Sequence, residues 1–442
     1  MPPSTGLARV TISSPQRRVD VALPATVPLA ELLSELLDHA GVGLADDGEQ
    51  HGGWQLRRAD GTALSPATGL SSQGVRDGSV LHLVPAREQW PQLEYDDVVE
   101  AIADGARRYG LAWSPRATRV TALAVAGLGL ATALAALLRG GSAPACLALA
   151  AVLVVGGSAA SRAYSDAVVG AALGAYGLPF AFAGGLLLGG GGWRPESLLV
   201  ASTGLLLAGV VGGLGVAHGL RLFAAGATAG LLGGVGALLA MVTTVAGTAA
   251  ALLALLVVGV AAVPLLAIRL GKLPMPALGL AGDRPETGLV YAAVARTDEL
   301  LTGMLLGVGL AAGGTALVLV DRRDVSGEVL VAVAATAFLL RARLFVTVRH
   351  RLPLLGAGLA GFALLAAGLL RTGSAQTGTV AGIALAAVAL GVALAGARYA
   401  TRPPSPYLGR AADVLDALCV VSVVPLACAV LGLYGLARGL AG

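Results

Sequence analysis

Residues 245–267 read VAGTAAALLALLVVGVAAVPLLA, a stretch without a single charged side chain. A helix of about 20 apolar residues spans the ~30 Å hydrocarbon core of a bilayer, because each residue adds about 1.5 Å to its length. The stretch is therefore long enough and apolar enough to cross a membrane. It predicts that lipid rather than water surrounds this part of the chain.

Other apolar stretches of comparable length follow the same pattern, and short segments that carry the charged residues separate them. Residues 327–341 form the shortest stretch, and Pro179 marks a position in the third where a helix can kink. The sequence thus predicts an all-α membrane domain of about 11 transmembrane helices. The predicted spans are 119–138, 143–161, 166–188, 197–217, 221–241, 245–267, 300–320, 327–341, 353–370, 379–399 and 415–437.

The composition of the whole chain agrees with a membrane protein. Hydrophobic residues make up 56% of the 442 residues, and charged residues only 13%. Soluble proteins carry about 25% charged residues, so this chain has too few to cover a water-facing surface. Its 64 glycines also fit, because glycine lets membrane helices approach closely. Four glycine pairs at helix-packing spacing predict packing within the chain or contacts between copies: Gly170 and Gly174, Gly209 and Gly213, Gly226 and Gly230, Gly303 and Gly307.

The distribution of positive charge predicts the orientation in the membrane. The N-terminus lacks the apolar core of a cleavable signal peptide, so the residues before the first span are expected to stay in the cytoplasm. With the loops then alternating, 17 Arg and Lys residues lie on the inner side and 6 on the outer side. Positive residues concentrate in cytoplasmic loops, so this count supports the topology. We expect a multi-pass protein of the cell (inner) membrane, with its C-terminus outside the cytoplasm.

The first 90 residues predict a small soluble domain with the element order β-β-α-β-β. Alternating polar and apolar residues favour strands, and leucines at helical spacing favour one amphipathic helix. Gly41 is expected to cap that helix. One helix against a mixed sheet is the β-grasp (α+β) arrangement. The expected elements are strands near 10–12 and 19–23 joined by a turn at 13–16, a helix at 29–40, and strands at 54–58 and 80–84.

Residues 69–84 resemble the last turn and strand of ubiquitin and its relatives. A conjugated ubiquitin ends in a free Gly-Gly tail, whereas this chain continues through Pro85 into further sequence. The domain is therefore expected to act as a docking module. We predict a ubiquitin-like cytosolic domain at 1–88, a linker at 89–118 with an amphipathic helix at 94–109, and a transmembrane domain at 119–442.

No motif in the sequence indicates catalysis. Gly271 and Lys272 lack the flanking residues of a nucleotide-binding P-loop, and no metalloprotease motif or nucleophile–base pair occurs. We expect no catalytic, cofactor-binding or metal-binding residue. No acid falls in the middle of a predicted span, which argues against a proton- or sodium-coupled pump and leaves a facilitator open.

Two predicted inner loops are rich in charge, one from Arg269 to Glu299 and one from Arg341 to Arg351. Their positive residues are explained by the orientation of the helices alone, or they form a surface on which a partner docks. Both interpretations stay open. The candidate docking residues are Arg57 and Arg58 in the soluble domain and Arg341, Arg343, Arg349 and Arg351 in the second loop.

A ubiquitin-like domain followed by about 11 membrane helices resembles EccD, the integral membrane component of the type VII (ESX) secretion system of actinobacteria. The resemblance covers essentially the whole chain and depends on the order of its parts. The stretches that carry it are RVTISSPQRRVDVALPATVPLAELLSELL (9–37), GWQLRRADGTAL (53–64), QGVRDGSVLHLVP (73–85), DDVVEAIADGAR (96–107), KLPMPAL (272–278), LRARLF (340–345) and SPYLGRAADVLDALCVVSVVPLACAVLGLYGLARGL (405–440).

The resemblance implies a non-enzymatic part of an inner-membrane complex that exports small WXG-type helical proteins. It implies EccB, EccE and the motor ATPase EccC as partners, with the soluble domain contacting the ATPase and EccE. It also implies that two EccD copies pair around a lipid-lined cavity, so we expect a homodimer and membrane lipid as partners, and no nucleic acid. The alternative function is a secondary transporter or facilitator of a small solute with a β-grasp regulatory domain.

Overall fold

The computed structural model describes residues 6–14, 17–40, 53–58, 60–86, 114–216, 218–272, 287–372, 374–401 and 405–435. The chain divides into two compact units, Met1–Trp113 and Ser114–Gly442. Each unit has its own core of buried apolar side chains. The predicted linker helix at 94–109, the cap at Gly41 and residues 273–286 of the predicted loop from Arg269 to Glu299 lie outside the described residues.

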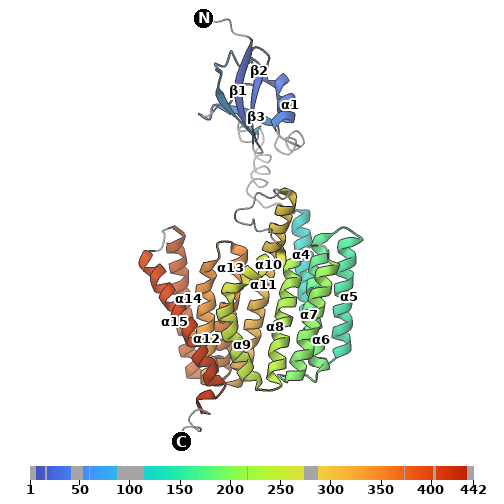
Figure 1. Ribbon diagram of the computed structural model, residues 1–442, viewed down its shortest axis with the longest axis vertical. Coiled ribbons are helices and arrows are strands. Elements are labelled where there is room, and N and C mark those ends of the chain that lie inside the picture. Colours follow the sequence, from blue (N-terminus) through green and yellow to red (C-terminus); the bar gives the residue numbers. More distant parts are fainter. Residues whose placement is uncertain are drawn as a thin grey trace, which may run out of the picture. The chain divides into compact units, whose positions relative to one another are not determined.

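The first unit contains a four-stranded mixed sheet and one helix (Figure 1). Strand β1 pairs antiparallel with β2 and parallel with β4, and β3 pairs antiparallel with β4, which gives the order β2-β1-β4-β3. The predicted element order β-β-α-β-β is therefore confirmed. The elements are β1 (Leu7–Ser13), β2 (Arg18–Pro24), α1 (Leu29–Ala40), β3 (Trp54–Arg58) and β4 (Ser79–Pro85).

Alternation of side chains along the strands builds the core of this unit. Val10 and Ile12 of β1 and Leu81 of β4 face one side of the sheet and are almost completely buried. Leu32 and Leu36 of α1 cover that side and are buried as well. A one-residue slip of any strand would turn its apolar side chains toward water, so this pattern fixes the register.

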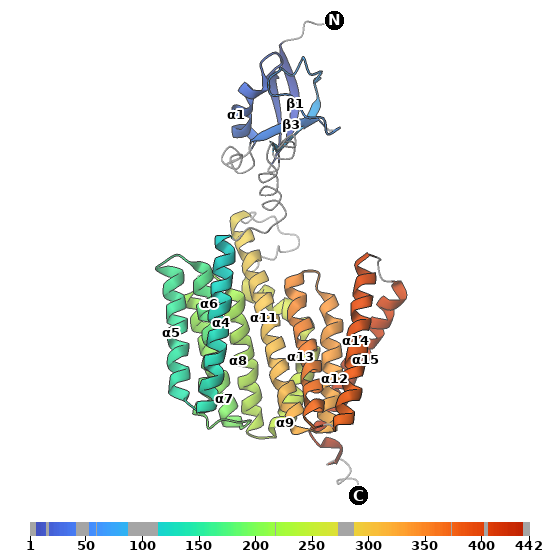
Figure 2. The ribbon, with the colours of Figure 1, turned by 180° about the vertical axis from the view of Figure 1, so that it is seen from behind.

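The second unit is a bundle of long helices that run side by side (Figures 1 and 2). Among the described residues, 11 helical spans are long and apolar enough to cross a membrane, as predicted. The helices are α4 (Pro115–Gly140), α5 (Ala143–Arg162), α6 (Ala167–Leu188), α7 (Pro195–Gly215), α8 (Leu220–Ala240), α9 (Val245–Gly259), α10 (Val263–Gly271), α11 (Thr287–Arg322), α12 (Val325–Arg341), α13 (Val348–Thr372), α14 (Ala375–Thr401) and α15 (Pro406–Val430).

The sixth span is broken, whereas the kink that the sequence suggested is at Pro179 in the third span. A 3-10 turn, η2 (Val260–Ala262), separates α9 from α10 within the span Val245–Gly271. Pro264 is the second residue of α10, just after the turn, and proline cannot donate the main-chain hydrogen bond that a continuous α-helix needs. Helix α6, in contrast, remains one helix through Pro179.

Two spans, those of α11 and α15, begin well before their predicted bounds. Helix α11 starts at Thr287 and continues without a break to Arg322, so the predicted span at 300–320 is only its second part. Helix α15 starts at Pro406 and not at residue 415. The charged residues that suggested later starts lie inside these helices. Four of them pair with side chains of other segments: Asp298 with Arg349, Glu299 with Arg221, Asp413 with Arg343, and Asp416 with Arg341.

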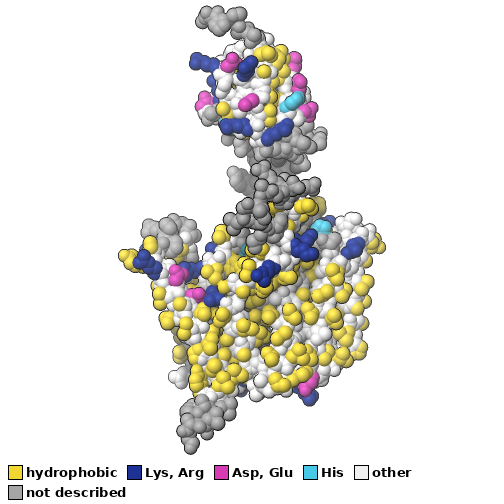
Figure 3. All heavy atoms as spheres, in the orientation of Figure 1, with side chains coloured by type: hydrophobic (Ala, Val, Ile, Leu, Met, Phe, Trp, Pro, Cys, Tyr) yellow, Lys and Arg dark blue, Asp and Glu magenta, His cyan; other side chains and the backbone are white. Residues whose placement is uncertain are grey.

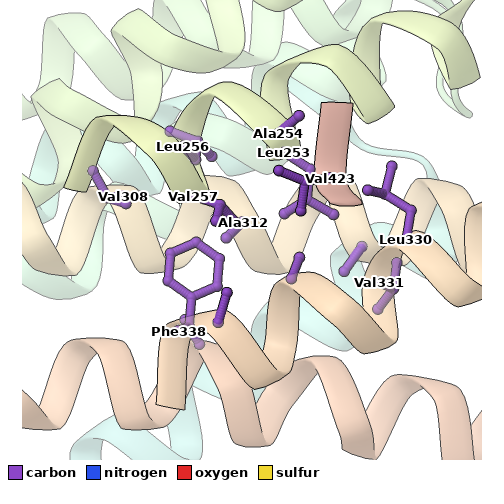
Figure 4. Close-up of a cluster of buried hydrophobic side chains, with 14 of the residues drawn as sticks. Leu253, Ala254, Leu256, Val257, Val308, Ala312, Leu330, Val331, Phe338 and Val423 are labelled. Atoms are coloured by element: carbon purple, nitrogen blue, oxygen red, sulfur yellow. The ribbon is translucent and has the colours of Figure 1, made fainter. Parts of the chain in front are cut away.

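The main core of the bundle lies between α9, α11, α12 and α15. Figure 4 shows Leu253 and Val257 of α9 next to Val308 of α11, Phe338 of α12 and Val423 of α15. Phe338 is among the largest fully buried side chains. Spans that are far apart in the sequence therefore share one core.

Glycine allows the helices of the bundle to approach closely. A Cβ atom on Gly303 would lie 2.5 Å from the main-chain oxygen of Arg221 on α8. Gly209 and Gly230 make similarly close approaches between α7 and α8. At these positions the structure therefore uses the predicted glycine pairs for packing within the chain.

We predict that G303A lowers the melting temperature of the protein in detergent, because the new methyl group would overlap the main chain of α8. Overpacking of this kind costs about 1–3 kcal/mol. The matched control is G313A on the same helix, where a Cβ meets nothing within 4 Å. Thermal denaturation followed with a thiol-reactive dye reports the exposure of buried Cys146 and Cys419. Equal melting temperatures for the two variants would contradict the close-packing argument.

Candidate functional site

Most ion pairs of the membrane unit lie at one end of the bundle. Because successive spans reverse direction, this is the end at which α4 begins, α10 ends and α13 begins. Figure 3 shows Lys and Arg side chains gathered toward it, above a broad hydrophobic surface. We call it the arginine end and define it by five ion pairs: Arg119–Asp166, Arg221–Glu299, Arg341–Asp416, Arg343–Asp413 and Arg349–Asp298.

Arg341 connects three helices of the core. It is the last residue of α12, and only 9% of its surface is exposed. Its Nε lies 3.3 Å from Oδ1 of Asp416 on α15. Its Nη1 donates to the main-chain oxygens of Val257 at 2.6 Å and Val258 at 3.3 Å, next to the 3-10 turn that interrupts the sixth span.

Asp416, the partner of Arg341, corrects the expectation that no acid falls in the middle of a span. Asp416 is well inside α15, because that helix begins at Pro406. A buried charge is tolerated only when it is paired and hydrogen-bonded. Arg341 meets this requirement through one carboxylate and two carbonyl groups. The pair therefore neutralises both charges inside the helical core.

Arg343 lies close by but is much more exposed. Its Nη2 is 3.1 Å from Oδ1 of Asp413, and 44% of the Arg343 side chain and 74% of the Asp413 side chain are exposed. Exposed pairs of this type contribute about 0–1 kcal/mol, because water screens the charges. Arg343 is thus available to other partners at little cost.

Asp298 joins α11 to the start of α13. Its two carboxylate oxygens lie 3.1 Å from Nε2 of buried His350 and 3.9 Å from Nη1 of Arg349. Arg351 donates its Nε–H to the main-chain oxygen of Phe345. The structure thus separates the four candidate arginines of this segment: Arg341 and Arg351 bind main-chain oxygens of the fold, while Arg343 and Arg349 pair near the surface.

The two candidate arginines of the ubiquitin-like unit differ in a similar way. The side chain of Arg58 donates to the main-chain oxygen of Gln73, and its main-chain N–H donates to Thr62. Arg57 pairs in register with His82 and alternates with buried Leu56, so it lies on the face of the sheet away from α1. Arg58 therefore holds a turn of the fold, and Arg57 belongs to the outer face of the sheet.

A cavity of ≈ 730 Å³ lies between α4, α6, α7, α8, α9 and α11. Apolar side chains such as Leu138, Phe182 and Leu310 make up most of its lining. The hydroxyl group of Thr315, which also lines it, donates to a main-chain oxygen of its own helix. The cavity suits a hydrocarbon chain, and no sequence pattern pointed to it, because its lining residues come from separate spans.

The described residues contain no group of three or more His, Cys, Asp or Glu side chains that could hold a metal ion. The charged clusters at the arginine end are ion pairs and hydrogen bonds between helices. These features define a multi-pass membrane protein with a ubiquitin-like domain, whose polar side chains hold helices together.

Comparison with known families gives this class a name. The family described as "EccD-like transmembrane domain" matches residues 118–440, which is most of the chain. The family described as "WXG100 protein secretion system (Wss), protein YukD" matches residues 7–83, the ubiquitin-like unit. The chain belongs to the EccD family of type VII (ESX) secretion-system membrane proteins.

Individual relatives agree with this assignment. The chain is 31% identical over 364 residues to the ESX-4 secretion system protein eccD4 of Mycobacterium tuberculosis, in both strain CDC 1551 / Oshkosh and strain ATCC 25618 / H37Rv. These alignments cover 76% of this chain and 77% of each relative.

Two solved structures share the fold. Protomer 1 of the ESX-3 core complex matches with a TM-score of 0.61 and 20% identity, over 97% of this chain and all of that one. A chain of the MycP5-free ESX-5 inner membrane complex in State II matches with a TM-score of 0.56 and 19% identity, over 90% of this chain and all of that one.

We predict that R341Q destabilises the protein by about 1–3 kcal/mol, because it removes the buried donor to the main-chain oxygens of Val257 and Val258 and leaves half-buried Asp416 without its partner. R343Q is the matched control and should cost no more than about 1 kcal/mol, because its ion pair is exposed. Thermal denaturation in detergent measures both. If R343Q proved as destabilising as R341Q, burial would not be the cause.

Proposed function

We propose that this protein is a non-enzymatic structural component of a type VII secretion complex, which exports small WXG-type helical proteins with energy from a partner ATPase. One observation carries the proposal: a YukD-like domain at 7–83 and an EccD-like membrane domain at 118–440 occur in one chain. The interhelical ion pairs support it, because they are of the kind that stabilises a scaffold.

We infer that the partners are proteins of the EccB, EccC and EccE types and a second copy of this chain. The fold that it shares with chains of ESX-3 and ESX-5 membrane complexes supports this inference. Arg343 and Arg349 are the docking candidates of the arginine end, since each keeps an exposed guanidinium group. On the ubiquitin-like unit, Arg57 on the outer face is a stronger docking candidate than Arg58.

We propose that the arginine end faces the cytoplasm, with the N-terminus on the same side and the C-terminus on the other. The positive-inside rule supports this orientation, because most described Arg residues of the membrane unit lie at that end. It places Arg343 and Arg349 where a cytoplasmic ATPase can reach them.

The alternative function, a solute transporter, finds no support in the large cavity. A buried charge inside a span would favour a transporter, and the nearest candidate is Asp416, which lies inside α15 with 27% of its side chain exposed. However, Asp416 is neutralised by Arg341, and neither residue lines the cavity. An ion or polar solute would find an apolar lining there, so we propose that membrane lipid occupies the cavity.

The lipid proposal predicts that G314F reduces the number of lipid molecules that stay bound, by roughly one for each chain. Gly314 lines the cavity, and a Cβ built on it meets nothing within 4 Å. G313F is the matched control on the neighbouring residue, which is not part of the lining. Mass spectrometry of the protein with its co-purified lipid gives the count. The same lipid number for both variants would contradict the proposal.

The role in secretion predicts that deletion of residues 1–90 leaves the protein inserted in the membrane but abolishes assembly of the complex. The physical reason is that the membrane unit has its own core, whereas the docking module is lost. Affinity purification of the tagged chain measures assembly through the yield of the EccC-type ATPase, and secretion of WXG-type proteins is followed in parallel.

A pair of charge variants refines this experiment. R343E combined with R349E should weaken the association with the ATPase, whereas R139E combined with R322E, at the opposite end of the bundle, should not. If the intact chain retains no ATPase, and its loss leaves export of WXG-type proteins unchanged, the proposed function is wrong.

A further inference from the structure

In the described part of the ubiquitin-like unit, the chain covers the β3 edge of the sheet and leaves the β2 edge open. Beyond β3, the following segment closes the edge: Arg58 donates to Thr62, Leu64 donates to Leu56, and Arg57 bridges to Ala63. Beyond β2, the described part of the chain adds no further strand, since the sheet order ends there. An open edge offers a row of main-chain donors and acceptors to another strand.

The register shows which main-chain groups face that open edge. The main-chain N–H of Ala25 donates to Gly6, and the N–H of Ser14 donates to Arg17. In an antiparallel ladder such bonded pairs alternate with non-bonded pairs. With the observed register, Val19 and Val21 therefore bond to β1. The N–H and C=O groups of Arg18, Asp20 and Ala22 point the other way, toward the open edge.

The opposite side of β1 confirms this alternation. Arg9 is paired in register with Ala22, and its main-chain oxygen accepts from Gly78 next to β4. Arg9 therefore directs its main chain away from β2, as a member of a non-bonded pair must. The open edge ends at Pro24, because proline has no N–H and because Ala25 is already bonded to Ser71.

The side chains of β2 indicate which kind of strand could pair with its open edge. Val19, Val21 and Leu23 form a half-buried row on the side of α1, while Arg18, Asp20 and Ala22 form an exposed row on the outer side. A strand added to the edge places its own side chains in the same two rows. Apolar residues at alternate positions would extend the first row and gain burial next to it.

Charge complementarity specifies the outer row further. Asp20 accepts a hydrogen bond of 2.6 Å from the hydroxyl of Thr11, so its charge is already engaged. Arg18 is exposed, and its nearest cross-strand residue on β1 is uncharged Ser13. A carboxylate on the outer face of an incoming strand, at the Arg18 end, would meet this guanidinium.

We propose that the β2 edge is a docking site for an extended segment of another protein, which adds a strand beside residues 18–24. The segment carries apolar residues at every second position and an acidic residue that meets Arg18. Main-chain hydrogen bonds hold it, and the alternate side chains select it. A regular helix could not bind in this way, because its main-chain groups are already bonded to one another.

The probe is the labelled peptide Ac-Glu-Val-Thr-Val-Thr-Val-Glu-NH2, titrated into the full-length protein in detergent and followed by fluorescence anisotropy. Its valines share one face, and the acids at both ends allow either strand direction. The control peptide has proline in place of the central valine and of the threonine before it, which removes a main-chain donor that faces β2 in either strand direction. We expect saturable binding of the first peptide and at least about tenfold weaker binding of the second.

Two substitutions at one position test the main-chain bonds. A22P removes an N–H that faces the open edge, and proline is tolerated at such a position, so the fold should persist. It should weaken peptide binding at least about tenfold, whereas A22T, which keeps the N–H, should bind like the original protein. Slow hydrogen exchange at Val19 and Val21 verifies that β1 and β2 remain paired.

Reversing the charge at position 18 provides a test that does not rely on proline. R18E should weaken binding of the acidic peptide, and a peptide with lysine in place of both glutamates should recover it. Hydrogen exchange of the original protein gives the most direct result, because the peptide should slow exchange at Arg18, Asp20 and Ala22. Both measurements remain valid if A22P fails to fold.

Several results would overturn the proposal. They are absence of saturable binding, equal affinity of correctly folded A22P and A22T, or protection of amides elsewhere but not at Arg18, Asp20 and Ala22. Protection of these amides without peptide, increasing with protein concentration, would also overturn it. That result would assign the edge to a second copy of this chain.

Discussion

The helical unit depends on one constraint: inside a bilayer no water is present to satisfy main-chain polar groups, so the protein must satisfy them itself. Unbroken helices meet the constraint automatically, and the sixth span does not, because η2 interrupts it before Pro264. Arg341 donates to the two carbonyl groups next to this break. The same guanidinium neutralises Asp416 and thereby joins α9, α12 and α15 into one core.

Close packing around that core relies on small residues. Lipid tails are as apolar as leucine, so helices in a membrane gain little from burying apolar side chains against one another. They gain from close contact, which glycine permits. Gly303 lies against the main chain of α8, and Gly209 and Gly230 bring α7 and α8 together. The high glycine content, which in a soluble protein would suggest flexibility, here produces rigid contacts.

The two units offer different chemistry to their surroundings. The membrane unit offers exposed guanidinium groups at Arg343 and Arg349 and a cavity suited to hydrocarbon. The ubiquitin-like unit offers main-chain groups along β2, on a sheet whose other edge its own chain has closed. Both surfaces suit a protein that organises others. In an EccD-family chain, these surfaces support the proposed role in assembly of the complex over a role as a solute transporter.

Much of this architecture was predictable from the sequence. The long apolar stretches determined the 11 spans, because a helix surrounded by hydrocarbon must be long and apolar. The alternation around Val10 and Val21 and the leucine spacing of 29–40 determined the β-β-α-β-β order of the first unit. In both cases the signal is local, because one segment contains the whole periodic pattern.

Only the tertiary structure decided how the charged residues are used. Arg341 and Arg343 are two positions apart and look equivalent in sequence, yet one is buried among three helices and the other is exposed. The charge of Asp416 suggested a late start for α15. The sequence does not show that Arg341, which is 75 positions away, neutralises this charge. Sequence determined which segments cross the membrane, since that depends on local hydrophobicity. Tertiary structure decided which charges are neutralised and where the cavity lies, since both depend on segments far apart in the chain.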